Sequence, residues 1–320
     1  MYLPARAIGR STDPAKAAPS VLSTTAPTGA AMSSAAERIP REARPGVRTV
    51  VVSGTPLRVA IRPSTGTGPP LLLANGIGTS LEVFQPFVDA LDPAIEVIRF
   101  DVPGVGGSPL PARPYRFATL ARLLRGLLDE LGYQAADILG FSWGGELAQQ
   151  FALCSPRRCR RLVLVATGTG PQTMVPGNPL ALAKMLTQRQ YLDADYSRRI
   201  AGKLYGGSAR TDPETISGIL LQTRVGPLRG YLYQHAAGLG WTSLPFLPLI
   251  RQPTLVLAGD DDPIIPLVNA RILAALIPSA RLHVYSGGHA ELVARPGLLA
   301  PLVSDFLARG SLRESSSVQR

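Results

Sequence analysis

Short apolar segments recur along this chain and alternate with segments of helical spacing. The segments are Leu71–Ala74, Ile95–Phe100, Ala136–Gly140, Leu162–Ala166, Thr254–Ala258 and Leu282–Tyr285. Such continuous apolar runs are typical of parallel strands whose two faces are both covered. The clearest helical stripe contains Leu120, Leu123, Leu124, Leu127, Leu128 and Leu131. The pattern therefore predicts an α/β fold, with a mostly parallel sheet and helices on both of its faces.

Two further features complete the predicted core, which spans residues 46–167 and 251–309. Val47–Ser53 and Leu57–Ile61 are β-branched runs separated by Gly54-Thr55-Pro56, which is typical of a hairpin. A last helix is indicated by the apolar positions between Leu298 and Leu307.

Residues 168–250 interrupt the alternation with helical pieces, aromatic residues and prolines. A connection of that length favours an inserted helical cap over the carboxyl edge of the sheet.

The two ends of the chain differ from this core in composition. Residues 1–45 are rich in Ala, Ser, Thr, Pro and Arg and show no periodicity, so we expect a disordered tail there. We expect residues 310–320 to form a flexible tail as well. Met1–Ser20 lacks the apolar stretch of a secretory signal, and no apolar run approaches the ~18–20 residues of a transmembrane segment. The sequence thus predicts a cytoplasmic protein without a transmembrane segment.

Charge and cysteine content set limits on partners and cofactors. The formal net charge is +11, but the basic residues are spread along the chain, so we expect no nucleic-acid site. The densest basic cluster is the short stretch Arg157–Arg161. Cys154 and Cys159 are the only cysteines, and neither their spacing nor a neighbouring histidine fits a metal motif. We therefore expect no metal and no cofactor.

A nucleophile is indicated by Gly140-Phe141-Ser142-Trp143-Gly144, which fits G-x-S-x-G. The pattern alone is weak, but here an apolar strand leads into it and a helix leaves it, as in a nucleophile elbow. The competing interpretation is a serine that only caps the helix. A serine needs a base, and the chain has three histidines. His289 follows the last strand, whereas His283 lies within that strand and His235 lies in the expected cap, so we assign the base to His289.

The acid that orients the base is expected between serine and histidine in chain order. Asp260, Asp261 and Asp262 follow the penultimate strand, and we choose Asp262 because it immediately precedes Pro263 at the turn. Asp101 instead follows an earlier strand, where we expect it to hold a turn by an Asx-type hydrogen bond.

An oxyanion hole requires two amide donors. We expect the amides of Trp143 and Ile77, with Asn75 supporting the Ile77 loop through side-chain hydrogen bonds. An ordinary glycine turn is the alternative interpretation of Asn75-Gly76-Ile77-Gly78. These residues predict an ester hydrolase that forms an acyl-enzyme on a serine.

Several of these stretches together resemble the intracellular depolymerases of medium-chain-length polyhydroxyalkanoate, which are α/β-hydrolases. The resemblance covers about Arg48 to Leu307 and is most specific at Asn75-Gly76-Ile77-Gly78 and Gly238-Leu239-Gly240-Trp241-Thr242-Ser243. It implies the α/β-hydrolase fold with a cap domain, hydrolysis of poly(3-hydroxyalkanoate) to 3-hydroxyacids or oligomers, and a position at storage granules. Related polyester synthases carry cysteine at the nucleophile position, where this chain has Ser142.

The expected substrate pocket contains Asn75, Trp241, Tyr231 and Tyr233, and Tyr205 and Phe246 belong to the same aromatic set. The aromatic residues can equally form the core of the cap. Rival functions on the same residues are a small-ester esterase, a thioesterase and a carbon–carbon bond hydrolase. A non-catalytic ligand receptor of the same fold is a further alternative.

Overall fold

The computed structural model describes residues 46–308, which form a mixed eight-stranded sheet covered by helices. The expected tails 1–45 and 310–320 lie outside these residues. The strand order is β1-β2-β4-β3-β5-β6-β7-β8. β4, β3 and β5 to β8 run parallel, whereas β2 is antiparallel to both of its neighbours. The strands are β1 Gly46–Val52, β2 Thr55–Arg62, β3 Leu71–Ala74, β4 Val97–Phe100, β5 Ala136–Phe141, β6 Cys159–Val165, β7 Thr254–Gly259 and β8 Ala280–Tyr285.

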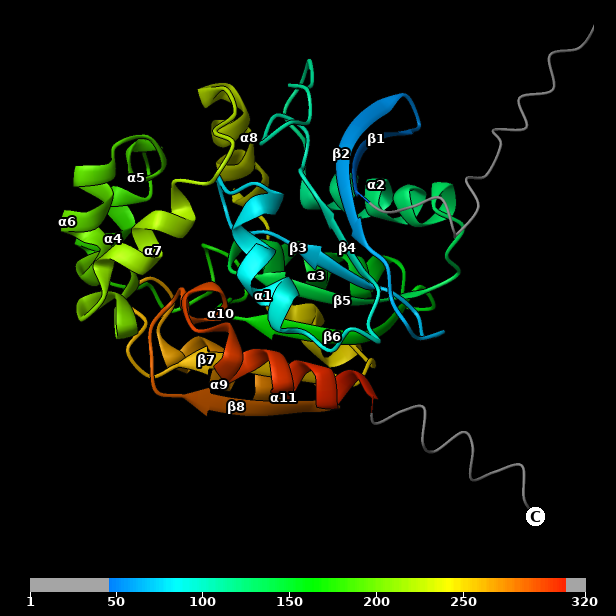
Figure 1. The fold of residues 1–320 in the computed structure, drawn as a ribbon. Helices are drawn as coiled ribbons and strands as arrows, with labels where there is room; N and C mark the ends of the chain where they lie inside the picture. The colour runs from blue at the N-terminus through cyan, green and yellow to red at the C-terminus, as the bar shows by residue number, and fades with distance from the viewer. Residues whose placement is uncertain (1–45, 309–320) are drawn as a thin grey trace, which may run out of the picture. The chain divides into compact units, whose positions relative to one another are not determined.

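Every apolar run singled out in the sequence is a strand of this sheet. β3, β4, β5 and β7 are buried along their whole length, because helices cover both faces. Figure 1 shows α1 (Gln85–Ala90) and α11 (Pro296–Ala308) in front of the sheet, and α2 (Phe117–Glu130) and α3 (Trp143–Cys154) behind it. The leucine stripe lies on α2, where Leu120, Leu124, Leu127 and Leu128 are buried and Leu123 is half-buried.

The hairpin at the edge of the sheet turns more tightly than the sequence suggested. Thr55 and Pro56 belong to β2 and pair with Val52 and Val51 of β1. Only Ser53 and Gly54 form the loop, with φ values of 47° and 79°. Two residues of positive φ match the right-handed twist of the flanking strands, and glycine makes the second position easy. The prediction that Gly54-Thr55-Pro56 is the turn is therefore wrong.

The connection between β6 and β7 is helical. Figure 1 shows α4 to α7 together, beyond the ends of the strands to which the arrows point. Its elements are α4 Pro179–Lys184, α5 Arg189–Leu192, α6 Ala194–Tyr205, η3 Gly207–Arg210, α7 Pro213–Leu220, α8 Leu228–Gly238 and η4 Leu244–Leu249.

Three helical elements near the sheet had no clear sequence signal and were missed. A 3-10 turn, η2 (Leu81–Phe84), leads into α1, α9 (Leu267–Leu276) follows β7, and α10 (Glu291–Ala294) follows the loop after β8. Within residues 46–308 no helix is long and apolar enough to cross a membrane.

Candidate active site

Ser142 lies at a sharp turn between β5 and α3. Its backbone has φ 54° and ψ −122°, a conformation that residues other than glycine rarely adopt. The turn is fixed by hydrogen bonds, because the Ser142 amide donates to the Val165 carbonyl at 2.9 Å and Thr167 Oγ1 donates to the Ser142 carbonyl at 2.8 Å. The strand, turn and helix form the elbow that the sequence predicted.

The glycines on either side of Ser142 are required by close backbone contacts. A Cβ at Gly140 would lie 2.3 Å from the Gly144 carbonyl oxygen. A Cβ at Gly144 would lie 2.1 Å from the Ala74 carbonyl oxygen, at the end of β3. The second contact shows that α3 begins directly against the loop that follows β3, so the serine and that loop are neighbours.

Ser142, His289 and Asp262 are joined by two hydrogen bonds. His289 Nε2 lies 3.0 Å from Ser142 Oγ, and His289 Nδ1 lies 2.7 Å from Asp262 Oδ2. All three residues are at most 8% exposed. The other carboxylate oxygen, Asp262 Oδ1, accepts the amides of Ile264 and Ile265. A carboxylate fixed in this way holds the imidazole in the tautomer whose Nε2 can accept a proton from the serine.

The two neighbouring aspartates have different partners. Asp261 forms an ion pair with Arg210 of η3 at 2.7 Å and accepts the Gly207 amide. Asp260 accepts the amide of Gly287, in the loop that carries His289. Of the three candidates only Asp262 contacts His289, while the other two fix the loops around it.

The remaining histidines lie away from Ser142. His283 is exposed on β8. His235 on α8 packs edge-on against Tyr231, with ring centroids 4.8 Å apart, and burial lowers its pKa. The structure therefore leaves His289 as the histidine in contact with the serine.

Glu291 supports the His289 loop and was not identified from the sequence. Its carboxylate accepts the amides of Gly288 and Ser208 and pairs with Arg295. Burial alone would raise the pKa of Glu291, but these hydrogen bonds outweigh it and the pKa is lowered. Its place two residues after His289 is the only sequence signal for this role.

The loop after β3 passes beside the serine. A Cβ at Gly76 would lie 3.7 Å from Ser142 Cβ. Among residues 46–308, the amides of Ile77 and Trp143 have no hydrogen-bond acceptor. Two unpaired amides beside a serine are the arrangement that an oxyanion hole requires.

The support of this loop differs from the expectation. Both polar side-chain atoms of Asn75 are buried and have no partner among the described residues, so the predicted hydrogen bonds of Asn75 are wrong. The loop is held instead by the segment between β6 and β7. Tyr191 donates its hydroxyl to the Ile77 carbonyl at 2.8 Å, and the Gly78 amide donates to Gln234 Oε1 at 2.8 Å.

Gly78 fits between two rings of the same segment. Its φ is 74°, and a Cβ there would lie 2.6 Å from the Tyr231 ring and 2.7 Å from the Tyr191 ring. Trp143, directly after the serine, also donates its indole N–H to the Gln234 carbonyl at 3.0 Å. The predicted oxyanion loop and the predicted cap are therefore in direct contact, which no motif in residues 168–250 indicated.

A cavity of about 30 Å³ lies beside Ser142, which is roughly the room for one or two water molecules. Trp241, Tyr231, Tyr233 and Asn75 do not line it. Trp241 packs on Phe117 with ring centroids 5.0 Å apart, and Tyr233 packs on Tyr115 at 6.4 Å. The side chains from residues 168–250 that do line it are Met185, Tyr191, Tyr205 and Leu220.

This result corrects the predicted pocket, because only Tyr205 of the expected aromatic set lines the cavity. Tyr231 is 1% exposed and packs against His235 of the same segment and against Gly78 of the loop after β3. Tyr191 and Leu220 were missed because helical spacing does not reveal which side of a short helix faces the serine.

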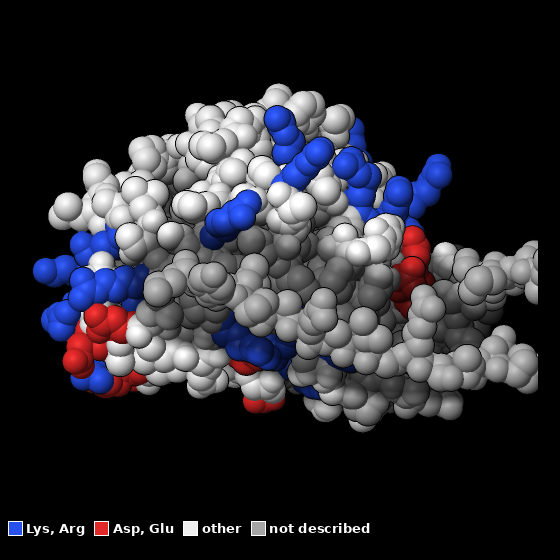
Figure 2. Space-filling model, turned by 90° about the horizontal axis from the view of Figure 1, so that it is seen from above, with Lys and Arg blue, Asp and Glu red and all other residues white. Residues whose placement is uncertain are grey.

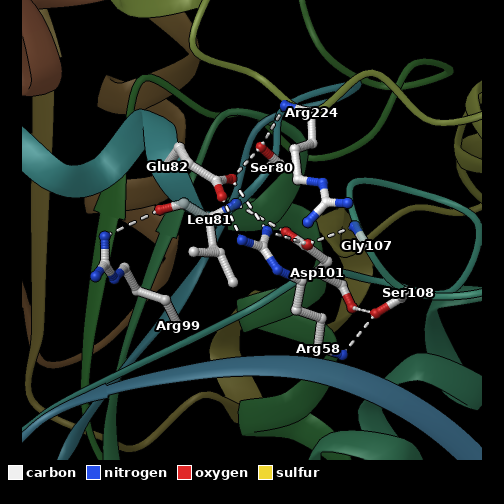
Figure 3. A network of polar contacts seen from close by, with 9 residues as sticks. All are labelled: Arg58, Ser80, Leu81, Glu82, Arg99, Asp101, Gly107, Ser108 and Arg224. Atoms are coloured by element: carbon white, nitrogen blue, oxygen red, sulfur yellow. Dashed lines mark hydrogen bonds and ion pairs between the residues drawn. The ribbon is translucent and has the colours of Figure 1, made fainter. Parts of the chain in front are cut away.

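Asp101 belongs to a polar network beside the site, shown in Figure 3. Asp101 accepts the amide of Gly107 and the amide of Leu81, each at 2.8 Å, and pairs with Arg58 at 3.0 Å. Asp101 therefore does hold the turn after β4, but through the amide six residues further on and not through the local Asx-type hydrogen bond that was predicted. Arg58 also pairs with Glu82, which accepts the Ser80 hydroxyl at 2.5 Å.

No group of three or more His, Cys, Asp or Glu side chains that could hold a metal ion occurs in the part of the chain that the structure describes. Cys154 is exposed and Cys159 is buried, and both are free thiols.

Comparisons with known proteins agree with this geometry. The sequence profile of the alpha/beta hydrolase fold matches residues 69–293. A poly(3-hydroxyalkanoate) depolymerase from Ectopseudomonas oleovorans is 50% identical over 81% of this chain and 92% of its own length. A 2-hydroxy-6-oxononadienedioate/2-hydroxy-6-oxononatrienedioate hydrolase from Burkholderia vietnamiensis is 34% identical over 81% of this chain and 94% of its own. The crystal structure of an enol-lactonase from Burkholderia xenovorans is similar with a TM-score of 0.70 and 25% identity, covering 81% of this chain and 99% of that one.

Proposed function

The chain belongs to the alpha/beta hydrolase fold family, and on that premise we propose that it cleaves the ester bonds of a poly(3-hydroxyalkanoate) by nucleophilic catalysis at Ser142. The observation that carries the proposal is the unbroken hydrogen-bonded series from Ser142 Oγ through His289 to Asp262. The 50% identity to a depolymerase over most of both chains supports the choice of substrate.

In the first half of the reaction, Ser142 Oγ attacks the carbonyl carbon of the ester while His289 Nε2 takes the serine proton. The carbonyl becomes a tetrahedral oxyanion, which accepts hydrogen bonds from the amides of Ile77 and Trp143. As the intermediate collapses, the carbon–oxygen bond of the ester breaks and His289 returns its proton to the leaving hydroxyl group. Asp262 stabilises the imidazolium throughout and stays ionised.

In the second half, water replaces the alcohol. His289 takes a proton from the water, the resulting oxygen attacks the acyl carbon, and the bond to Ser142 Oγ breaks as the serine recovers a proton. The products are a carboxylic acid and a free hydroxyl group, so a polyester of hydroxyacids is shortened at each turnover.

We propose that residues 168–250 form a cap that selects the acyl chain. This proposal is supported by the contacts of Met185, Tyr191, Tyr205 and Leu220 with the cavity beside Ser142. These protein side chains are mostly apolar, so they suit an alkyl group of the substrate rather than a charged group.

The decisive experiment compares hydrolysis of an aqueous poly(3-hydroxyoctanoate) latex by wild type and Ser142→Ala. We expect clearing of the latex and release of hydroxyacid with wild type, and a loss of at least about 10⁴-fold in the variant. Ser279→Ala, at an exposed position, is the matched control and should keep full activity. Latex clearing by Ser142→Ala at the wild-type rate would refute the mechanism.

The 34% identity to a hydrolase of another substrate class favours one second candidate, carbon–carbon bond hydrolysis on the same residues. Short nitrophenyl esters, thioesters and an oxo-dienoate substrate, assayed beside the latex, separate these activities. A fluorophosphonate probe tests the receptor alternative, because a receptor without a reactive serine would leave Ser142 unlabelled.

We also propose that the protein acts in the cytoplasm at the surface of polyester granules. The proposal follows from the insolubility of the polymer, whose ester bonds are reached only at a surface. Cosedimentation of the protein with isolated granules checks it, and recovery of all protein in the granule-free supernatant would count against it.

A further inference from the structure

A second concave site lies between α2, the turn of the β1–β2 hairpin and the loop 103–115, and we call it the α2 groove. Its volume is about 700 Å³, within the range of sites that hold small organic ligands. It shares no lining residue with the cavity beside Ser142. The groove is therefore a separate feature of the molecule that the hydrolytic mechanism does not use.

The wall of the α2 groove is largely apolar. The apolar lining side chains are Pro103, Pro111, Pro114, Tyr115, Leu120 and Leu123. Leu123 belongs to the leucine stripe of α2, yet it is only half-buried, because no other element of residues 46–308 covers it fully. The hairpin approaches α2 closely at one end, where a Cβ at Gly126 would lie 2.5 Å from Val52 Cγ1. Such a wall accommodates an alkyl chain and not a charged one.

Three arginines, Arg113, Arg122 and Arg125, also line the groove. Neither Arg113 nor Arg125 has a hydrogen-bond or ion-pair partner among residues 46–308, and Arg122 makes only a 3.4 Å contact with Thr119 Oγ1. The single acid of the lining, Asp129, is already paired with Arg158 at 2.8 Å. The groove thus has free guanidinium groups and no free carboxylate.

The start of α2 adds to this positive potential. The helix begins at Phe117, its N-cap Arg116 makes no side-chain capping bond, and its first turn contains no acid. The unpaired amides and the helix dipole leave partial positive charge there. Figure 2 shows basic side chains gathered at the upper right of the face seen from above, with acidic side chains at one edge of them.

From the apolar wall and the unpaired arginines, we propose that the α2 groove binds a medium-chain carboxylate. The alkyl chain lies against the prolines and leucines, and the carboxylate pairs with one of the three guanidinium groups, which can hold both of its oxygens. A monomeric ligand is favoured over a lipid surface because the groove is concave, whereas a surface is bound by groups that protrude. Residues 1–45 are a poor occupant, since they carry more basic than acidic residues.

Isothermal titration of the full chain with decanoate, below its micelle concentration, tests the proposal. We expect one site, no comparable binding of 1-decanol, which lacks the charge, and none of propionate, which lacks the chain. Arg122→Glu/Arg125→Glu should weaken decanoate binding at least about ten-fold, as expected for lost charge-assisted hydrogen bonds. Arg251→Glu/Arg271→Glu makes the same charge change at exposed positions outside the groove and should bind like wild type.

A product carboxylate can also enter the catalytic site, so the titration is repeated on protein whose Ser142 carries a phosphonate. Unchanged binding is expected, because the groove is separate. Loss of binding after this modification would place the carboxylate at Ser142 and overturn the proposal. So would equal affinity for 1-decanol, or binding only to phosphatidylglycerol vesicles and not to monomeric decanoate. None of these outcomes depends on whether the protein hydrolyses polyester.

Discussion

Single residues decide how the reacting groups are held. Ser142 has a positive φ, Gly144 fits directly against the end of β3, and Tyr191 and Gln234 hold the loop that contains the Ile77 amide. Each of these positions is fixed by a partner far away in the sequence.

The first prediction concerns the hydroxyl of Tyr191. Tyr191→Phe removes the hydrogen bond to the Ile77 carbonyl and leaves that carbonyl buried without a partner, at a cost of about 1–3 kcal/mol in stability. We expect kcat on a short nitrophenyl ester to fall on the order of ten-fold with KM nearly unchanged, because an oxyanion donor acts in the transition state. Tyr196→Phe, whose hydroxyl makes no hydrogen bond to a described residue, is the control. An unchanged kcat would show that the tyrosine does not position the amide.

The second prediction concerns Glu146, on the first turn of α3. Burial raises the pKa of its carboxyl to about 8, so the folded protein keeps this proton at neutral pH. The unfolded chain releases the proton near pH 4.5, and stability should therefore fall as the pH rises from about 4.5 to 8. Glu146→Gln has no carboxyl to titrate, so its stability should not fall for this reason. The free energy of unfolding of the variant minus that of wild type should therefore rise between pH 4.5 and 8, by on the order of a few kcal/mol.

Urea unfolding at pH 5, 7 and 9 measures the effect of Glu146→Gln. Glu130→Gln, at the exposed end of α2, is the control and should show no such trend. A difference between Glu146→Gln and wild type that is the same at all three pH values would contradict the buried neutral carboxyl.

At the scale of elements, the Asp101 network joins β2, η2 and the loop after β4. Burial raises the pKa of Asp101, yet the amides of Leu81 and Gly107 and the Arg58 guanidinium all favour its ionised form. The Arg224 amide extends the network to the predicted cap by donating to Ser80 Oγ at 2.9 Å. The elements around the site are therefore connected through one buried carboxylate.

Asp101→Asn should be destabilising, by about 1–3 kcal/mol, since one amide oxygen cannot accept all three donors and the half-buried Arg58 keeps only Glu82 as an ion-pair partner. Asp195→Asn breaks an exposed pair with Arg198 and should cost less than about 1 kcal/mol. Thermal or urea unfolding of the two variants gives the comparison. Equal stability of both would mean that the network adds nothing beyond a surface ion pair.

At the scale of the whole molecule, the small cavity beside Ser142 limits which substrates can reach the serine. About 30 Å³ holds a water molecule or two, whereas the acyl chain of a long ester needs several times that room. Four of the side chains that line the cavity belong to residues 168–250, and the His289 amide donates to the Tyr205 carbonyl at 2.7 Å. We therefore expect entry of a long substrate to require movement of the predicted cap.

We expect an ethyl fluorophosphonate to label Ser142 faster than a dodecyl one in dilute solution. Leu220→Ala enlarges the cavity, so it should narrow this difference by at least about three-fold, at a stability cost of about 2–4 kcal/mol. Leu247→Ala, which is buried but does not line the cavity, is the matched control. A dodecyl probe that reacts as fast as the ethyl probe with wild type would show that the site is already open.

The sequence by itself determined the class of fold and the kind of chemistry. Continuous apolar runs are typical of parallel strands that are covered on both faces, and all of those identified are strands. Three histidines and one G-x-S-x-G left few combinations, and the residues chosen for nucleophile, base and acid are in contact through hydrogen bonds. The strands could be predicted because periodicity is a local property of the sequence, and the triad could be predicted from the order of its residues along the chain.

Only the tertiary structure decided how the site is supported and which side chains surround it. Tyr191 and Gln234, not Asn75, hold the oxyanion loop, and Leu220, not Trp241, lines the cavity. The turn at Ser53-Gly54 was also set by the register between β1 and β2. Contacts between residues distant in the chain depend on how elements pack, and short helices without a regular apolar stripe give no local sign of the face that they bury.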